Sequence, residues 1–409
     1  MTAGLMSRAS PDHLSTIADR DRMRSDRIER VRSHMQAQGV DALVLLGNTN
    51  VVYATGAVWP LADASRQSFE RPVALVLADD ATPHLFSPIR ADDRLRAELP
   101  EDHLHGPAHL DFDEGVELFR SRVAELIPQG AVVAIDEWTH ALRRASWPGG
   151  GEAPLIAGGG IISKAKALKT LDEVACMREA LRITELGMQQ AQARLAPGVR
   201  QTELTATFLR TIFEAGADAN VLDPIWQVMP TQISDGPWTT TGGLACPLLS
   251  TERVLERGDV MWVDAGITFG GFQSDFGRTW IVGDEPSVRQ RSQFAQWKAI
   301  IDAVLSVTRA GATISQLTAA AIDVAGGEKP WMPHFYLGHG LGIDSAEMPF
   351  LGSDIGQAFD DSTRLAAGMI VVLEPIVWED GAGGYRSEEV LLITEDGWEP
   401  LTDYSYEPF

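Results

Sequence analysis

Short apolar runs separated by amphipathic stretches dominate the first third of the chain. Three apolar runs, Asp41–Gly47, Pro72–Asp79 and Ala131–Asp136, are typical of buried strands. Gly115–Ile127 has the apolar spacing of a helix, and Arg22–Met35 alternates arginines with apolar positions as an exposed helix does. Strands that alternate with helices predict an α/β N-terminal domain with a mostly parallel or mixed sheet.

A Gly- and Pro-rich stretch, Ser146–Gly160, interrupts this pattern. Soon afterwards a capping box at Thr170–Glu173 predicts the start of a long helix that continues to about Ala193. We therefore predict an N-terminal domain over residues 1–160 and a C-terminal domain over residues 161–409.

Helical periodicity returns in the C-terminal half. A second capping box, Thr313–Gln316, predicts the start of another helix. The residues just before it that share one helical face and should belong to the core are Phe294, Trp297, Ile301, Val304 and Leu305.

Composition and charge narrow the possible functions. At 409 residues the chain is too long for one ordinary core, and a content of 44% hydrophobic and 22% charged residues is globular. A net charge of −23 disfavours nucleic acid as a partner, because phosphates would be repelled. Cys176 and Cys246 cannot form a disulfide framework. Without an apolar leader or a run of 18 apolar residues, no membrane association is expected and the location is predicted to be cytoplasmic.

The first chemical signal lies in Val260–Val282, where two apolar runs flank Gly270-Gly271 as in a β-hairpin. Pairing about this turn makes Asp264 and Asp275 opposite or diagonal neighbours on one face, with Cα atoms within roughly 8 Å. Two carboxylates this close repel unless a cation lies between them or one keeps its proton. Two surface acids are the alternative reading, but each aspartate adjoins strongly apolar strand residues.

A second hairpin, Ile370–Thr394, repeats this geometry. Its turn is predicted at Asp380–Gly384, and Glu374 and Glu388 are symmetric about the centre of that turn. These two carboxylates should therefore face each other across the strands. Glu389 has the opposite parity and is expected to point away from them.

A histidine completes the set of candidate ligands. His339 lies between glycines, which let a backbone approach a site closely. A lone histidine is more often structural, but this one is the best-placed imidazole for four inward acids. Four carboxylates and one imidazole suit two divalent ions such as Mn, Fe, Co or Zn. Two such ions would acidify a bridging water and polarise a substrate oxygen.

The five residues, in this order, resemble the metal site of the pita-bread family. That family includes methionine aminopeptidase, aminopeptidase P, prolidase, creatinase and a dimethylsulfoniopropionate lyase. The matching motifs are VDAG at Asp264, SDFGRTW at Asp275, GHGLG at His339, LEP at Glu374 and GGYRSEE at Glu388.

The resemblance extends over most of the chain. Arg27–Gly56 is similar to the start of a creatinase-type N-terminal domain, and Ala167–Met188 is similar to the first helix of the catalytic domain. The resemblance implies an α/β creatinase-like N-terminal domain followed by an α+β pita-bread catalytic domain. It also implies a homodimer in which the partner helps to close each active site.

Two departures from the family pattern concern histidines. Peptidases of this family carry one before the first aspartate, where this chain has approximately Pro247, and another after the metal histidine, where it has Ala346. Those side chains normally bind the substrate carbonyl and handle protons in peptide cleavage. Beyond His140 the only histidines are His334 and His339. Standard proline-peptidase activity is therefore not expected.

We expect a dinuclear metallohydrolase that cleaves a C–N bond in a small-molecule, polar substrate. The resemblance implies that Glu374 both binds metal and shuttles a proton. A metal-dependent lyase is the alternative, because Glu395–Phe409 resembles the end of dimethylsulfoniopropionate lyases. Those lyases carry an additional acid two residues after the first aspartate, however, where this chain has Gly266 and resembles the hydrolases. A silent binding protein on the same scaffold is a third possibility, and the retention of all five ligands speaks against it.

Polar side chains near the motifs are weaker candidates for substrate contacts. Arg386 could pair with a substrate carboxylate or neutralise the acids. The other candidates are Tyr336, Asp344 and Glu347 close to His339, and Trp59, Arg66 and Arg71 in a polar, aromatic segment that could form a lid.

Overall fold

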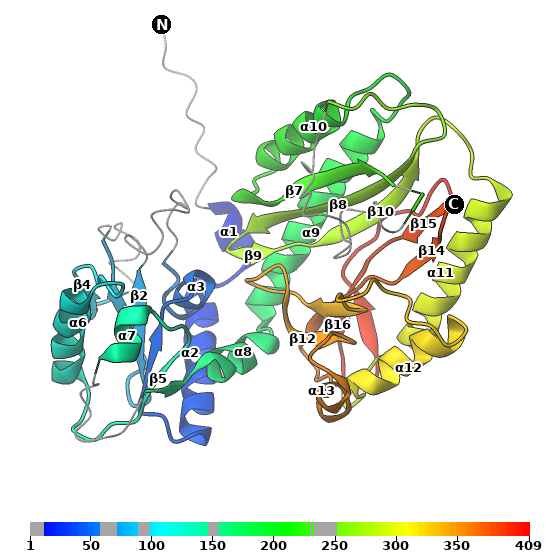
Figure 1. Cartoon of the computed structure of the whole chain (residues 1–409). Coiled ribbons are helices and arrows are strands. Elements are labelled where there is room, and N and C mark those ends of the chain that lie inside the picture. Colours follow the sequence, from blue (N-terminus) through cyan, green and yellow to red (C-terminus); the bar gives the residue numbers. More distant parts are fainter. Residues whose placement is uncertain (1–11, 58–71, 89–98, 146–154, 230, 233–251) are drawn as a thin grey trace, which may run out of the picture. The chain divides into compact units, whose positions relative to one another are not determined.

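The computed structural model describes residues 12–57, 72–88, 99–145, 155–229, 231–232 and 252–409 (Figure 1). These residues form two compact units. The N-terminal unit comprises residues 18–166 and 170–172, and the other described residues form the C-terminal unit. The predicted boundary between residues 160 and 161 falls inside α8 (Gly159–Ala167), most of which clusters with the N-terminal unit.

A six-stranded sheet forms the centre of the N-terminal unit. Its strands, in spatial order, are β4 (Leu104–His105), β3 (His84–Phe86), β2 (Val73–Leu77), β1 (Ala42–Leu45), β5 (Val133–Ile135) and β6 (Ile156–Ala157). The three apolar runs of the sequence correspond to β1, β2 and β5. Because β1 is antiparallel to β2 and parallel to β5, the sheet is mixed, as predicted.

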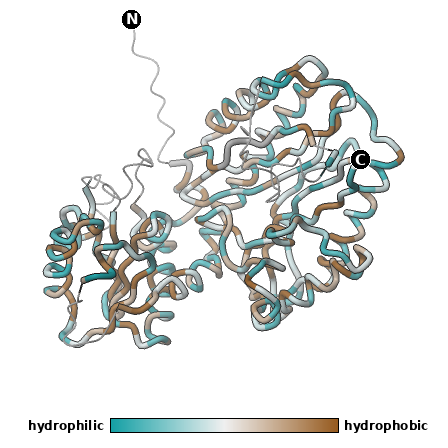
Figure 2. The backbone as a smooth tube through the Cα atoms, viewed as in Figure 1, coloured by the Kyte–Doolittle hydropathy of each residue, from teal (hydrophilic) through white to brown (hydrophobic). Residues whose placement is uncertain are grey.

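Helices cover both faces of this sheet (Figure 1). They are α2 (Arg20–Ala37), α3 (Asn48–Thr55) and α8 on one side, and α6 (Asp113–Leu126) and α7 (His140–Arg144) on the other; a short 3-10 helix, η2 (Glu101–His103), precedes β4. Successive residues of a strand face opposite sides, so Val44 joins the core under α6 and α7 while Leu43 points to the other layer. The strands are mostly brown, that is hydrophobic, in Figure 2.

The C-terminal unit contains three antiparallel sheets. The first has the order β10 (Phe276–Ile281), β8 (Val260–Phe269) and β7 (Ala219–Val228), and β9 (Phe272–Gln273) also pairs with β8. The second has the order β12 (Glu347–Leu351), β11 (Gly338–Gly340), β13 (Ile370–Leu373), β16 (Glu389–Ile393) and β17 (Trp398–Pro400). The third is the two-stranded hairpin of β14 (Ile376–Glu379) and β15 (Gly383–Arg386).

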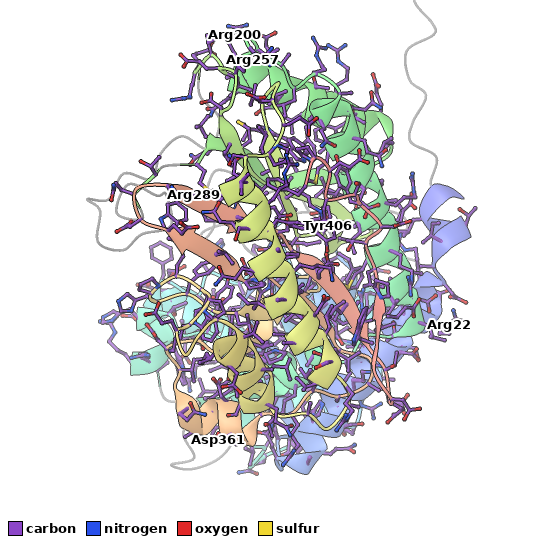
Figure 3. All side chains as sticks on the ribbon, turned by 90° about the vertical axis from the view of Figure 1, so that its right-hand side faces the viewer. Arg22, Arg200, Arg257, Arg289, Asp361 and Tyr406 are labelled. Carbon is purple, nitrogen blue, oxygen red and sulfur yellow. The ribbon has the colours of Figure 1, made fainter. Side chains whose placement is uncertain are left out.

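Helices α11 and α12 close the core of the C-terminal unit. Its helices are α1 (Asp12–Ile17), α9 (Leu171–Gln192), α10 (Gln201–Glu214), α11 (Val288–Val307), α12 (Ile314–Val324) and α13 (Gln357–Ser362). The predicted capping box at Thr313 and Gln316 begins α12. The five apolar positions predicted as one face of a helix lie on α11 and pack into the core. Tyr406 lies beside α11 in Figure 3 and contacts Phe294 and Trp297.

Two smaller predictions can be compared with the described residues. Cys176 is buried, whereas Cys246 lies outside the described residues. Within the described parts of the chain, no helix combines the length and the apolar character needed to cross a bilayer.

Candidate metal centre

The first hairpin has the register that its glycine turn predicts. Asp264 on β8 lies opposite Gly277 on β10, so Asp275 is its diagonal neighbour. Asp275 is not in a strand, however, but in the gap between β9 and β10. The ladder stops there because the side chain of Ser274 replaces a backbone partner and accepts a hydrogen bond from Ile267 N at 2.9 Å.

The second hairpin is also symmetric about its predicted turn. β14 pairs with β15 and β13 pairs with β16 in one continuous register. Gly383 and Gly384 belong to β15, so the turn spans residues 380–382 and is shorter than the predicted Asp380–Gly384. Glu374 and Glu388 lie in the gap between the two ladders, on opposite strands.

Other elements satisfy the backbone at this gap. Glu374 N donates to Leu337 O at 2.9 Å, and Glu388 N donates to Gly277 O at 3.1 Å. Arg278, which sequence reasoning missed, donates from Nη1 to Glu388 O at 2.7 Å and is 2% exposed. A charged residue inside the apolar run after Asp275 was the available signal. These bonds fix Glu388 relative to the first hairpin and Glu374 relative to the residue before β11.

The five predicted ligands converge into one group, called the acid cluster below: Asp264, Asp275, His339, Glu374 and Glu388. His339 Nε2 lies 3.3 Å from Asp275 Oδ2 and 3.5 Å from Glu374 Oε1. Carboxylate oxygens of Asp264, Asp275 and Glu388 lie within 4.8 Å of one another. Because His339 Nδ1 lies 2.8 Å from Gly340 O, it donates there and leaves Nε2 facing the acids.

Arg386 lies in the middle of these acids. Its guanidinium is 3.1 Å from Asp264 Oδ2 and 2.6 Å from Glu374 Oε2, and it also pairs with Glu388. With 4% exposure and a pKa that the acids raise against the effect of burial, it stays charged. Of the two roles that the sequence left open for Arg386, these contacts match neutralisation of the acids.

The acid cluster carries more negative than positive charge. Four carboxylates face one guanidinium and one imidazole, which leaves a deficit of two positive charges even when both are charged. Burial and the charge of Asp264 raise the pKa of Asp275 to about 7. Burial also raises the pKa of Glu388 and of Glu374, although Arg386 opposes both shifts. Burial would lower the pKa of His339, but Asp275 and Glu374 raise it to about 9.

The donor set fits divalent cations. Asp264 Oδ1 and Glu388 Oε2 are buried and have no hydrogen-bond partner among the described residues. A buried carboxylate oxygen without a partner is costly unless a cation faces it. Oxygen ligands with a single imidazole are the type that Mn, Fe, Co and Zn accept. The residues present could therefore hold metal ions.

A cavity of about 190 Å³ opens onto the acid cluster. Tyr336 lines it, and its ring meets that of His339 edge-on at 5.2 Å. Burial, followed by the charges of Glu374 and Asp275, raises the pKa of Tyr336, so its hydroxyl stays protonated. The described lining includes Ser345 and the exposed Ala346 but not Asp344.

Among the remaining described candidates, Glu347 is not in the lining of this cavity. Glu347 forms a buried ion pair with Lys169, which explains its burial without a substrate. Four positions lie outside the described residues, namely Trp59, Arg66, Arg71 and Pro247.

Comparisons with known proteins identify both parts of the chain. The sequence model of metallopeptidase family M24 matches residues 175–395, and that of the creatinase/prolidase N-terminal domain matches residues 27–146. An uncharacterized peptidase of Staphylococcus aureus is 23% identical over 380 residues, which cover 92% of this chain and 99% of that protein.

Solved structures show the same fold. The Xaa-Pro dipeptidase from Bacillus anthracis matches with a TM-score of 0.73 and 22% identity, covering 93% of this chain and 98% of that chain. Prolidase from Pyrococcus furiosus matches with a TM-score of 0.69 and 21% identity, covering 91% and 99%. The predicted creatinase-like N-terminal domain and pita-bread catalytic domain are thus confirmed. The resemblance to dimethylsulfoniopropionate lyase stays a prediction.

Proposed function

Because this chain belongs to metallopeptidase family M24, we propose that it is a metal-dependent hydrolase that cleaves a C–N bond in a small polar substrate. Two divalent ions, of Mn, Fe, Co or Zn, would be held by Asp264, Asp275, His339, Glu374 and Glu388. The observation that carries the proposal is the convergence of these five side chains, which include two unpartnered carboxylate oxygens, beside one cavity that all of them except Glu388 line.

The residues of the acid cluster have separate tasks in this proposal. Ions bound there would acidify a water and polarise the substrate carbonyl. Glu374 can move a proton, because one of its oxygens lies 3.5 Å from His339 while the other is bound by Arg386. Arg386 keeps that carboxylate in place and offsets part of the negative charge.

The cavity supports a small substrate and an unusual donor set. Its volume of about 190 Å³ is below the roughly 300 Å³ at which sites for drug-sized ligands begin. Ala346 presents only a methyl group where family peptidases carry a histidine. The Tyr336 hydroxyl is a protonated donor in this lining that could contact a substrate carbonyl. We therefore propose an activity other than standard proline-peptide cleavage.

A substrate panel on the full-length protein, reconstituted separately with Mn²⁺, Co²⁺ and Zn²⁺, tests this proposal. The panel contains Xaa-Pro dipeptides, which the names of the fold relatives suggest, creatine-like amidines and dimethylsulfoniopropionate. Uptake of ¹⁸O from water into a product, with release of an amine, would establish hydrolysis. An alkene product without ¹⁸O would establish the lyase instead. Bound metal without any turnover would favour the binding protein.

We also propose that the chain works as a homodimer, because the family resemblance implies it. Sedimentation velocity at several concentrations measures the assembly directly. A single species with the mass of one chain at all concentrations would contradict the dimer.

A further inference from the structure

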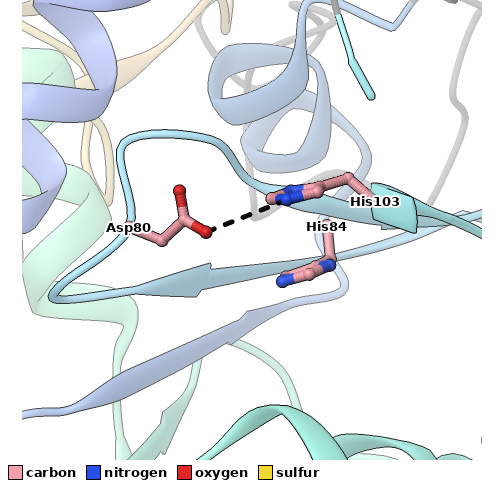
Figure 4. Close-up of side chains that lie close together, drawn as sticks. All are labelled: Asp80, His84 and His103. Atoms are coloured by element: carbon pink, nitrogen blue, oxygen red, sulfur yellow. Dashed lines mark ion pairs between the residues drawn. The ribbon is translucent and has the colours of Figure 1, made fainter. Parts of the chain in front are cut away.

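Three histidines and an aspartate gather at the β4 edge of the N-terminal sheet, and Figure 4 shows Asp80, His84 and His103. They are called the histidine cluster below: Asp80, His84, His103 and His105. Asp80 lies in the turn between β2 and β3, His84 begins β3, His103 ends η2, and His105 lies in β4. Parallel pairing of β3 with β4 brings these segments together. None of the four belongs to the acid cluster.

The spacing between Asp80 and His103 is unusual for a direct contact. Asp80 Oδ2 lies 3.8 Å from His103 Nε2, which is too long for a hydrogen bond. Two ligands that each lie about 2.0–2.1 Å from a tetrahedral ion are roughly 3.3 Å apart. One ligand atom from each of Asp80, His84 and His103 lies within 4.8 Å of the others. A small closing movement would therefore bring all three to a shared ion.

Hydrogen bonds outside this trio orient two of the ligands. Asp80 Oδ1 accepts from Thr82 N at 2.8 Å, which leaves Oδ2 facing His103. His84 Nδ1 lies 3.1 Å from His105 Nε2, so the other nitrogen of His84 faces away from His105. Second contacts of this type fix ring orientation in known metal sites.

The two candidate imidazoles are stacked, with His84 buried and His103 half-buried. Their ring centroids are 4.1 Å apart with an interplanar angle of 7°. Burial, followed by the charges of His103 and His105, lowers the pKa of His84 to about 4, so this ring is neutral near pH 7. His103 Nδ1 is buried and has no hydrogen-bond partner among the described residues, so this nitrogen does not hold the ring in its present plane. The lone pairs of parallel rings lie in parallel planes, and a tilt of His103 would let them converge on one ion.

We propose that Asp80, His84 and His103 bind one divalent transition-metal ion of the Zn²⁺ class, with water in the fourth position. Two imidazoles and one carboxylate are the borderline ligand set that Zn²⁺ and Co²⁺ accept. The bound ion would tie the turn after β2 to η2 and stabilise this edge of the sheet. The inference does not depend on the proposed hydrolase function.

A titration of the metal-free, tag-free full-length protein with Co²⁺ tests the site. The d–d absorption of bound Co²⁺ and equilibrium dialysis together count the bound ions. Zn²⁺ should displace the Co²⁺. We expect the wild type to bind one equivalent more than the variant His84→Gln/His103→Gln. Asp80→Asn should weaken that equivalent by roughly tenfold or more. Asp79→Asn, at the exposed neighbouring position, is the matched control and should not change binding.

In the same experiment, the variant Asp264→Asn/Glu388→Gln distinguishes ions bound by the acid cluster from the ion bound by the histidine cluster. This variant should lose the ions of the catalytic unit and keep the equivalent that His84→Gln/His103→Gln removes. Equal stoichiometry in wild type and His84→Gln/His103→Gln would overturn the proposal. If the double variant fails to fold by circular dichroism, Asp80→Asn and His103→Gln, at less buried side chains, give the same readout.

Discussion

The acid cluster and the histidine cluster both gather metal-binding side chains, but their charge differs. The acid cluster has four buried or half-buried carboxylates around Arg386 and His339, so it is short of positive charge. In the histidine cluster, Asp80 faces stacked rings, and His84 is neutral near pH 7. The first site therefore needs cations for its stability, whereas the second can persist without them. Ligand geometry alone would not reveal this difference.

The largest effect is expected on kcat, from a substitution of the proposed proton-transferring residue Glu374. Glu374→Gln should lower kcat of the substrate identified in the panel by roughly 10²–10⁴-fold, because an amide cannot take up a proton as the carboxylate does. Initial rates with saturating metal measure this, and Glu379→Gln at an exposed position of β14 is the control. The Co²⁺ equivalent assigned to the histidine cluster should be unchanged. Equal rates in the two variants would contradict the role of Glu374.

The second effect tests how the acid cluster is held. Arg278→Met removes the buried guanidinium that binds Glu388 O at 2.7 Å and Tyr404 O at 2.9 Å and leaves Glu389 without its nearby cation. The free energy of unfolding in urea should fall by about 3–5 kcal/mol.

Arg289→Met is the control for that variant. Arg289 is exposed, and its partner Glu379 lies 3.7 Å away, so the loss should be under about 1 kcal/mol. Similar losses in both variants would show that the hydrogen bond from Arg278 to Glu388 O contributes no more to the free energy of unfolding than an exposed ion pair does.

The third effect is a pH dependence of the metal-free protein. In the folded state the pKa of Asp275 is raised to about 7 from 3.8, and that of His339 to about 9 from 6.5. The folded state therefore binds protons that the unfolded state has released, and the stability from these groups is lost as the pH rises from about 4 to about 9.

Asp275→Asn should reduce the loss of unfolding free energy between about pH 4 and pH 7 by on the order of a few kcal/mol. Thermal unfolding in chelator, from pH 4 to 9, measures the difference from wild type, with Asp396→Asn as an exposed control. Added Mn²⁺ should reverse the decline in wild type. A wild-type curve parallel to that of Asp275→Asn would contradict the raised pKa of Asp275 in the folded state.

The smallest effect concerns the histidine cluster without metal. Asp80→Asn in chelator should change the free energy of unfolding by less than about 1 kcal/mol, because the 3.8 Å contact with His103 is long and Asp80 is partly exposed. Urea unfolding measures it, and the same experiment with Zn²⁺ should show wild type stabilised more than the variant. A large loss in chelator would mean that Asp80 has a structural role.

The sequence predicted both hairpins because a glycine turn fixes which residues pair. Asp264 lies diagonal to Asp275, and Glu374 and Glu388 are symmetric, as the spacing indicated. Parity also distinguished the two adjacent acids of the last motif. Glu389 points away from the cluster and accepts a hydrogen bond from the Tyr406 hydroxyl.

What the sequence could not provide arises from contacts between distant segments. The clamp of Arg278 on Glu388 joins two hairpins, and no local pattern encodes it. The histidine cluster depends on the pairing of β3 with β4, which places His84 beside His103 although neither segment has a motif. Arg386 had two open roles because only packing decides whether its guanidinium faces the acids or a substrate.

The gap in the second hairpin bears on which insertions and deletions the gene could tolerate. Glu374 and Glu388 take their backbone bonds from Leu337 and Gly277 instead of from each other's strand. Extra residues at the tip, between positions 380 and 382, would lengthen the loop and leave both acids in place. A single residue inserted between Arg386 and Glu388 would reverse the parity and turn Glu388 away from the metal side. Length variation among descendants of this gene should therefore accumulate at the tip and be absent from the strands below it.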